Sequence, residues 1–509
     1  MPLERSAVND THGDISVPAS FRAAFSSPRR LRIEVLAGLV VALALIPEAI
    51  SFSILAGVDP RVGLFSSFIM AVTIAFTGGR PAMITAATGA VALVIAPLVA
   101  SHGLNYLIAA VILAGVFQIL LAATGVAKLM RFIPRSVMVG FVNALAILIF
   151  MAQIPHLYNV PWVVYPLMAV AIAIMMFLPR VTTAVPAPLI AIIVLTAVAM
   201  LGGLRLPDVA DQGELPSSLP QFLIPDVPLT LETLKVIAPF SLAMALVGLM
   251  ESLMTAKLVD DLTETRSDKT REAWGQGAAN IASGFVGGMG GCAMIGQTMI
   301  NVKESRARTR LSTLLAGIFL LILVVTLGDI VGQIPMAALV AIMIMVSVGT
   351  FDWHSIAPRT LTLMPWSETA VMLVTVAATL ATHNLAVGVV TGVVMAMAMF
   401  ARRVAHLTTV EKIADVDTDD DGRVNLRTYR VVGQLFFASS NDLVYQFDYD
   451  NDPAQVVIDL TDAEVWDAST VATLDAITRK YAAKGTEVQI IGLDGASKRR
   501  LDRLTGELV

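Results

Sequence analysis

Long apolar runs alternate with short polar turns between residues 35 and 400, and this pattern predicts a helical membrane protein. An apolar run of about 20 residues is long enough to cross a bilayer as a helix. Some of the runs are shorter, so some spans must be tilted or be half-helices. We predict fourteen spans, at residues 35–56, 62–77, 82–101, 105–124, 136–154, 162–178, 186–202, 236–256, 273–288, 291–304, 311–328, 335–350, 368–382 and 384–400.

The last hundred residues differ from the rest of the chain. The 509 residues are 56% hydrophobic and only 15% charged overall, whereas a soluble protein carries about a quarter charged residues. After residue 406, Asp, Arg and Lys become frequent, and strand patterns alternate with helix patterns, which predicts a small α/β domain. We therefore expect a polar N-terminal segment (1–32), a transmembrane domain (33–406) and a soluble domain (407–509).

Basic residues collect on alternate turns between the predicted spans, and cytoplasmic turns of membrane proteins carry such an excess of Lys and Arg. This asymmetry places the N-terminus and the C-terminal domain in the cytoplasm and predicts a multi-pass protein of the inner (plasma) membrane. The basic residues of these turns are Arg80, Lys128, Arg131, Arg135, Arg180, Lys257, Arg266, Lys269, Arg271, Lys303, Arg306, Arg308, Arg310, Arg359, Arg402 and Arg403.

A long polar loop at residues 202–233 divides the spans into seven and seven, with repeats at about 33–205 and 235–406. Because seven is odd, a duplicated half inserts upside down, as in many secondary transporters. Spans 3 and 10 open alike, with GGRPAMITAATG and GGMGGCAMIGQT, and each restarts as a helix, near Thr88 and near Gln297. Two helix N-termini then face each other near mid-membrane, and their free N–H groups and partial positive charges make an anion site.

Little in the sequence suggests metal, cofactor or redox chemistry. The single cysteine, Cys292, excludes an internal disulfide. The acidic run at 417–422 fits the first half of a calcium loop, but Thr428 stands where such a loop needs Glu, so we predict a solvated turn. We expect no enzyme activity, no catalytic residues, no cofactor, no metal site and no nucleic-acid partner.

Several of these stretches resemble the SulP family, the sulfate-permease relatives of prestin and pendrin. They are AGLVVALALIPEAISFSILAGVDPRVGLFSSF (37–68), the opening of span 3, and GGMGGCAMIGQTMINVKESRARTRLS (287–312). In the C-terminal part, VVIDLTDAEVWDASTVATL (456–474) resembles the core of a STAS domain. The resemblance covers nearly the whole chain.

The resemblance implies a core domain of spans 1–4 and 8–11 that moves against a gate domain of spans 5–7 and 12–14, in an elevator-like cycle within a homodimer. It also implies where the anion binds, between the N-termini of spans 3 and 10. The implied substrate-binding residues are Glu48, Phe52, Ala87, Thr88, Gly89, Gly296, Gln297 and Thr298. The implied cation-coupling residues are Glu251 and Thr255 of span 8, with Glu48.

Two departures from the family pattern change the expected charge of the site. Gln297 stands where many animal relatives have Arg, and Glu48 stands where they have Gln. The site then holds two carboxylates, Glu48 and Glu251, and no basic side chain. Because an anion is repelled unless a carboxylate is neutralised, we favour symport of a small anion (sulfate or a small di/carboxylate) with H⁺ over Na⁺.

Other interpretations stay open at this point. The same architecture suits bicarbonate or chloride transport coupled to Na⁺ or by exchange, and it suits a nucleobase–proton symporter, although those ordinarily lack a C-terminal domain. A different class is a membrane-tethered sensor or scaffold that recruits cytoplasmic partners through the STAS domain. Glu48 itself could serve a structural role, against the backbone freed by the kink at Pro47.

Overall fold

The computed structural model describes residues 16–125, 133–181, 186–204, 206–228, 230–405, 408–416, 425–440 and 442–504. The chain forms two compact units, residues 1–393 and 394–509. The acidic turn predicted at 417–422 lies outside the described residues.

The first unit is helical along most of its length, as the apolar pattern predicts. Among the described residues, eight helices are long and apolar enough to cross a membrane, and the shorter apolar helices α8, α13 and α15 accompany them. The helices are α1 (Val17–Ala24), α2 (Pro28–Ala56), α3 (Pro60–Thr77), α4 (Gly89–Ala123), α6 (Arg135–Gln153), α7 (Val164–Val181), α8 (Ala187–Leu201), α9 (Leu231–Thr263), α10 (Lys269–Phe285), α11 (Ile295–Met299), α12 (Arg310–Gly332), α13 (Met336–Thr350), α14 (Pro358–Leu363), α15 (Trp366–Thr382) and α16 (Leu385–Ala405).

Each predicted span overlaps one of these helices, with differences at two places. The predicted third and fourth spans follow each other directly as the two helical parts of α4, which are separated by the non-helical backbone of Gly103 (φ 78°, ψ −172°). The N-terminal segment, predicted only as polar, contains the short helix α1.

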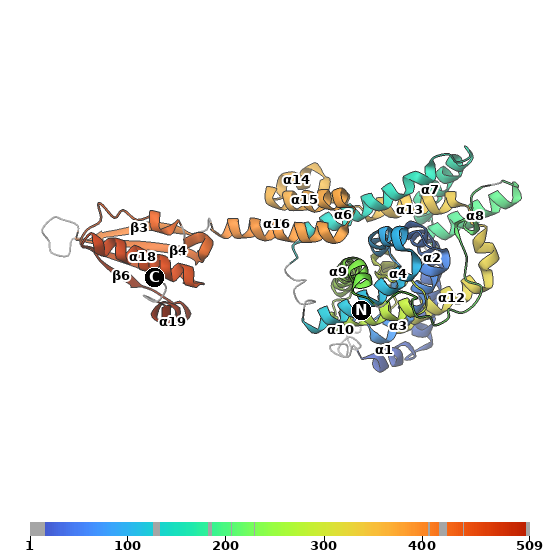
Figure 1. Ribbon diagram of the computed structural model, residues 1–509, viewed down its shortest axis with the longest axis horizontal. Helices are drawn as coiled ribbons and strands as arrows, with labels where there is room; N and C mark the ends of the chain where they lie inside the picture. Colours follow the sequence, from blue (N-terminus) through green and yellow to red (C-terminus); the bar gives the residue numbers. More distant parts are fainter. Residues whose placement is uncertain are drawn as a thin grey trace, which may run out of the picture. The chain divides into compact units, whose positions relative to one another are not determined.

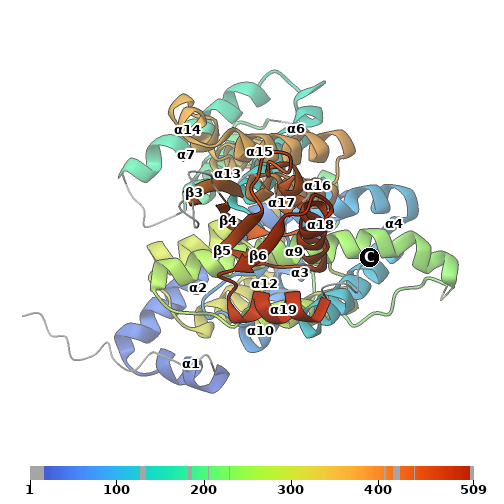
Figure 2. The same cartoon turned by 90° about the vertical axis from the view of Figure 1, so that its left-hand side faces the viewer.

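The helices pack in two groups, which correspond to the predicted core and gate domains. In the core group, α4 packs on α9 and α10, while α12 packs on α2 and α3 (Figure 1). In the gate group, α6 packs on α13 and α15, and α7 packs on α8 and α13. Figure 2 shows α6, α7, α13 and α15 together above α2, α3, α9, α10 and α12. Contacts between the groups are sparser and run mainly from α2 to α13 and α8 and from α4 to α6.

Two short strands at the centre of the core group confirm the prediction that spans 3 and 10 open with matched non-helical segments. Strand β1 (Thr85–Ala86) pairs antiparallel with β2 (Cys292–Ala293), with Thr85 opposite Ala293 and Ala86 opposite Cys292. Their residues are buried in protein. Non-helical backbone at membrane depth needs such enclosure, because its polar groups have no water to bind.

The glycines before β2 allow the two backbones to approach this closely. A Cβ atom on Gly291 would collide with the carbonyl oxygen of Ala86, and Gly290 has a φ of +70° that L side chains rarely adopt. The Asn280 side chain of α10 fixes the same turn, because its Oδ1 accepts from Gly291 N–H (2.9 Å) and its Nδ2 donates to Gly291 O (3.2 Å). Backbone pairing and this amide together hold the second break in place.

The second unit is the predicted small α/β domain, built on a mixed sheet in the order β3–β4–β5–β6. Strand β3 (Thr409–Val416) is antiparallel to β4 (Leu426–Leu435), whereas β5 (Gln455–Val465) is parallel to both β4 and β6 (Glu487–Ile491). Helix α18 (Ala468–Ala483) packs its apolar side into the core of the domain and is followed, after β6, by α19 (Gly495–Leu504).

A buried carboxylate organises the polar part of this domain. Asp452 accepts hydrogen bonds from Arg427 Nη1 (2.6 Å), Tyr429 Oη (2.9 Å) and Tyr481 Oη (2.5 Å). Burial and then the Asp452 charge raise the pKa of the nearby Tyr449 to about 12, and they raise the pKa of Tyr481 as well. These phenols therefore stay neutral and Tyr429 and Tyr481 remain hydrogen-bond donors to Asp452.

Substituting Gly291→Ala will lower the melting temperature of the detergent-purified protein, because the added methyl group forces β1 and β2 apart. Overpacking of this kind costs about 1–3 kcal/mol. The matched control is Gly349→Ala in α13, where an added Cβ meets no heavy atom within 4 Å. Equal melting temperatures for the two variants would contradict the close β1–β2 approach.

Candidate anion-binding site

The start of α4 is enclosed by side chains from the core and the gate. A Cβ atom on Gly89 would lie 2.9 Å from the ring of Phe52 in α2 and 3.1 Å from Ile149 Cδ1 in α6. The structure therefore brings the predicted residues Phe52 and Gly89 together. Ile149 comes from the gate group, and no polar or helix-breaking signal in the sequence pointed to it.

Thr88 caps α4, and its hydroxyl accepts from Val91 N–H (3.5 Å). Just before it, Ala87 N–H donates to Ser67 Oγ of α3 (3.2 Å). The first N–H groups of a helix lack intrahelical partners, so this end of α4 offers donors and a partial positive charge. The predicted trio Ala87, Thr88 and Gly89 thus lies at the N-terminus that the sequence indicated.

The second helix start is α11, which begins at Ile295 and continues through a π-helical turn, η4 (Ile300–Glu304). Gly296 is exposed, and a Cβ atom placed on it would meet no heavy atom within 4 Å. Next to it, Gln297 is buried, and its side chain interacts with the Glu48 carboxyl of α2. The start of α11 thus offers open space at Gly296, and the next residue, Gln297, turns inward toward Glu48.

Thr298, also predicted to bind substrate, uses its hydroxyl within the protein. Thr298 is fully buried, and its Oγ1 accepts from Ile84 N–H (3.0 Å), just before β1. This bond ties α11 to the first broken segment. A contact of Thr298 with substrate stays a prediction.

Glu251 of α9 lies beside the paired strands, where it is buried and its Oε2 accepts from Cys292 Sγ (2.9 Å). Cys292 Sγ also lies 3.1 Å from Thr88 Oγ1. The Thr255 hydroxyl donates to the main-chain oxygen of Glu251 (2.8 Å). A cation shared by Thr255 and Glu251 stays a prediction. As the single cysteine of the chain, Cys292 indicated only the lack of an internal disulfide, although it lies inside the second glycine-rich motif.

Buried ionic groups fix the turn that precedes β1. Glu272 of α10 accepts from Gly79 N–H (2.7 Å) and Arg80 N–H (3.1 Å). Arg310, counted in the sequence as a basic turn residue, is almost wholly buried, and its Nη2 donates to Gly78 O (2.6 Å). A cation at the C-terminal end of α3 is favourable because the last carbonyl groups of a helix carry partial negative charge. Glu272 and Arg310 were missed because no local pattern separates them from solvated turn residues.

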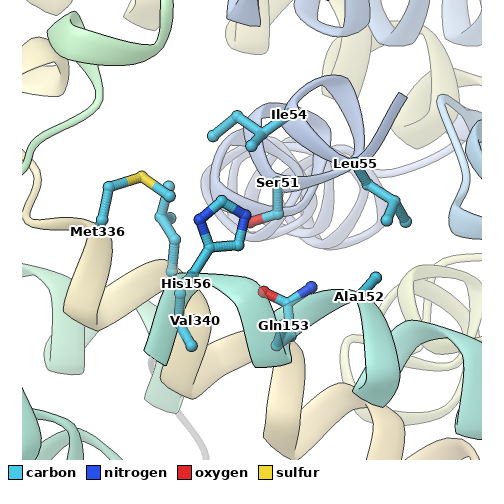
Figure 3. Close-up of a pocket in the computed structure, with 9 residues that line it drawn as sticks. Ser51, Ile54, Leu55, Ala152, Gln153, His156, Met336 and Val340 are labelled. Carbon is cyan, nitrogen blue, oxygen red and sulfur yellow. The ribbon is translucent and has the colours of Figure 1, made fainter. Parts of the chain in front are cut away.

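Two cavities lie at the gate helices, and the first of them also borders the core helix α2. The first, of about 20 Å³, is lined by Ser51 of α2, Gln153 of α6 and His156 among others, and it has room for about one water molecule. Figure 3 shows Gln153 and His156 extending from the gate side toward α2. A second cavity of about 210 Å³ shares His156 and continues past Tyr158. Ser51 lies three residues after Glu48, so the first cavity is close to the helical face that carries this carboxyl.

A helical membrane unit with two broken spans that meet at its centre has the architecture of a polytopic transporter, and a small α/β domain follows it. Residues 31–164 and 159–375 match the Sulfate permease family, and residues 416–506 match the STAS domain. The chain belongs to the sulfate permease family of anion transporters and carries a C-terminal STAS domain.

Relatives and solved structures agree with this assignment. The chain is 52% identical over 474 residues to the protein named "Putative sulfate transporter YbaR" of Bacillus subtilis, covering 93% of this chain and 97% of that protein. It is 25% identical over 530 residues to the bicarbonate transporter BicA of Picosynechococcus, covering 94% and 91%. The fold matches the murine anion transporter Slc26a9, in its inward-facing state, with a TM-score of 0.80 at 16% identity, over 96% of this chain and 89% of that one.

Replacing Thr298 by Val will lower the melting temperature in the absence of any anion, because it leaves the buried N–H group of Ile84 without its acceptor. An unsatisfied buried donor costs about 1–3 kcal/mol. Thr298→Ser keeps the hydroxyl and should melt close to the wild type. If Val and Ser at this position melt alike, the hydroxyl does not hold the two breaks together.

Proposed function

We propose that this protein is a secondary active transporter that moves a small anion, sulfate or a small di/carboxylate, together with a proton. The observation that carries the proposal is the meeting of two helix starts at the buried β1–β2 pair, with open space at Gly296 and with the Glu251 carboxyl against Cys292 of β2. Helix N-termini bind anions through N–H groups and the helix dipole without basic side chains. The proposed binding residues are those predicted from the sequence: Glu48, Phe52, Ala87, Thr88, Gly89, Gly296, Gln297 and Thr298.

The charge of the site supports proton coupling. Glu48 adjoins Gln297, and Glu251 is connected to Thr88 through the Cys292 thiol, which contacts both side chains. Two unit charges 4 Å apart repel by about 4 kcal/mol at an effective dielectric constant of about 20. A proton on one of these carboxyl groups removes that repulsion, so a proton and an anion bind together more readily than either alone.

The packing of the two helix groups supports an elevator-like cycle. Both helix starts belong to the core group, whereas Ile149 and the cavity-lining residues Gln153 and His156 belong to the gate side. Because contacts between the groups are sparse and leave a cavity between α2 and the gate, the core can slide against the gate with the anion attached. We further propose a homodimer in the inner membrane, with the N-terminus and the STAS domain in the cytoplasm and the STAS domain free to bind cytoplasmic partners.

Bicarbonate is the second candidate substrate, with Na⁺ coupling or exchange. The chain is similar along 94% of its length to proteins named bicarbonate transporter BicA. The greater similarity to YbaR favours sulfate as the first anion to test. A nucleobase substrate fits less well, because nucleobase–proton symporters ordinarily lack a C-terminal domain and this chain carries a STAS domain.

Replacing Glu251 by Gln will make sulfate uptake into proteoliposomes insensitive to an inward proton gradient, since the amide carries no titrating proton. Wild-type uptake should rise severalfold when the outside is acidified. The matched control is Glu232→Gln, at an exposed position of the same helix, which should behave like the wild type. If Glu251→Gln keeps the pH response and Glu48→Gln loses it, then Glu48 carries the proton. Flux of sulfate, bicarbonate and dicarboxylates that ignores both proton and Na⁺ gradients would overturn symport.

Replacing Gly296 by Val will weaken sulfate binding without unfolding the protein, because the new side chain enters open space where we place the anion. The expected result is an unchanged melting temperature without anion and at least a roughly tenfold higher sulfate concentration for a given thermal shift. Gly349→Val, also in open space but in α13, is the control. Normal sulfate stabilisation of the Gly296 variant would place the anion elsewhere.

A further inference from the structure

Three side chains from separate parts of the core form one hydrogen-bonded chain. Cys292 of β2 stands between Glu251 of α9 and Thr88, the residue that caps α4, with Sγ–Oε2 and Sγ–Oγ1 distances of 2.9 and 3.1 Å. All three are buried, with exposed fractions of 9% for Glu251, 0% for Cys292 and 2% for Thr88. The chain thus connects the proposed coupling carboxyl to the helix start that would hold the anion.

The charge of Glu251 decides in which direction this chain runs. An ionised carboxylate only accepts hydrogen bonds. The thiol then donates its single hydrogen to Glu251, and the sulfur accepts from the Thr88 hydroxyl. In this state the Thr88 hydrogen points at sulfur and is not available to an anion. The thiol itself keeps its proton, because a thiolate beside the carboxylate would be a second buried negative charge.

A proton on Glu251 reverses every donor and acceptor in the chain. The carboxyl O–H now donates to the Cys292 sulfur, and the S–H group rotates to donate to Thr88 Oγ1. The Thr88 hydrogen is released from sulfur and can rotate toward the N-terminus of α4. One proton arrives from water and stays on Glu251, while thiol and hydroxyl keep their own protons and only rotate, so no bond between heavy atoms forms or breaks.

We propose that this reversal couples the proton to the anion: Cys292 is a positioning residue through which a protonated Glu251 turns the Thr88 hydroxyl into a donor for the bound anion. The proposal rests on the proton-coupled anion transport proposed above and assigns a role to a residue outside the predicted site. It explains how a carboxyl that does not itself touch the anion changes the affinity for it.

The groups around the chain leave Glu251 as the residue that switches it. Glu251 is the ionisable group that acts electrostatically on the Cys292 thiol. Two other carboxyl groups lie nearby. Glu48 of α2 is on the far side of Gln297, and Glu272 of α10 has oxygens that already accept from Gly79, Arg80 and Gln276. The polar side chains that face this region from α4, α10 and α11 are neutral: Thr88, Gln118, Gln276, Asn280 and Gln297.

The test compares sulfate binding by the full-length protein and its variants across pH 5.5 to 8, using thermal-shift titrations. Cys292→Ser keeps one donor and one acceptor and should retain the rise in sulfate affinity as the pH falls. Cys292→Ala removes the sulfur that accepts from Thr88 when Glu251 is ionised, so the Thr88 hydrogen is available to the anion at every pH. This variant should lose the rise because it binds sulfate at pH 8 about as tightly as the wild type does at pH 5.5. If Cys292 served only to pack the site, Cys292→Ala should preserve the pH dependence of sulfate affinity better than Cys292→Ser, since Ala suits an apolar site better than Ser.

Infrared spectroscopy provides a second readout that needs no substitution. Cys292 is the single cysteine of the chain, so the S–H stretching band belongs to it alone. The band should shift as Glu251 titrates, because the thiol exchanges a carboxylate acceptor for a hydroxyl, and Glu251→Gln should abolish the shift. A band that stays fixed while sulfate affinity changes with pH would overturn the reversal.

The outcomes separate this proposal from the proposed function. If Glu251→Gln loses the pH dependence while Cys292→Ala keeps it, proton coupling stands and the hydrogen-bonded chain is refuted. If Glu251→Gln and Glu48→Gln both keep the pH dependence, the coupling mechanism itself fails, and the chain fails with it. Loss of the pH dependence in both Glu251→Gln and Cys292→Ala, with retention in Cys292→Ser, supports the proposal.

Discussion

Backbone that leaves a helix inside a membrane must find its hydrogen-bond partners within the protein. Here the two non-helical segments supply each other's backbone hydrogen-bond partners, because β1 and β2 pair antiparallel between opposite halves of the chain. The glycines, the Asn280 amide and the Thr298 hydroxyl all serve this one pairing. The proposed anion site follows from it, since two helix starts that would otherwise lie apart are placed next to each other.

Burial of charge is the second constraint on the core. Glu272 and Arg310 are enclosed, yet each binds main-chain groups of the turn between α3 and β1. These main-chain groups, together with the Gln276 amide that donates to Glu272, compensate the cost of burying the two charges. The Glu251 carboxyl, by contrast, accepts a hydrogen bond from a thiol, and a thiol stabilises a negative charge much less than a cation would. A carboxyl in that position is well suited to gaining and losing a proton.

The family assignment and the local chemistry answer different questions. Membership in the sulfate permease family fixes the architecture, and relatives named for sulfate and for bicarbonate share it. Helix N-termini bind either anion by the same physics. What distinguishes this chain is the set of side chains around those N-termini: Gln297 with Glu48 on one side, and Cys292 with Glu251 on the other.

The sequence by itself determined the spans, the two repeats of seven spans each, the matched breaks in spans 3 and 10, and the α/β domain. Apolar length, periodicity and glycine clusters are local signals. It also indicated Thr88 and Gln297 as helix starts. Only the tertiary structure decided that Ser67, Ile149 and Cys292 lie at these starts and that Arg310 is buried. These facts depend on which helices pack together, and packing joins residues more than two hundred positions apart, which no local pattern records.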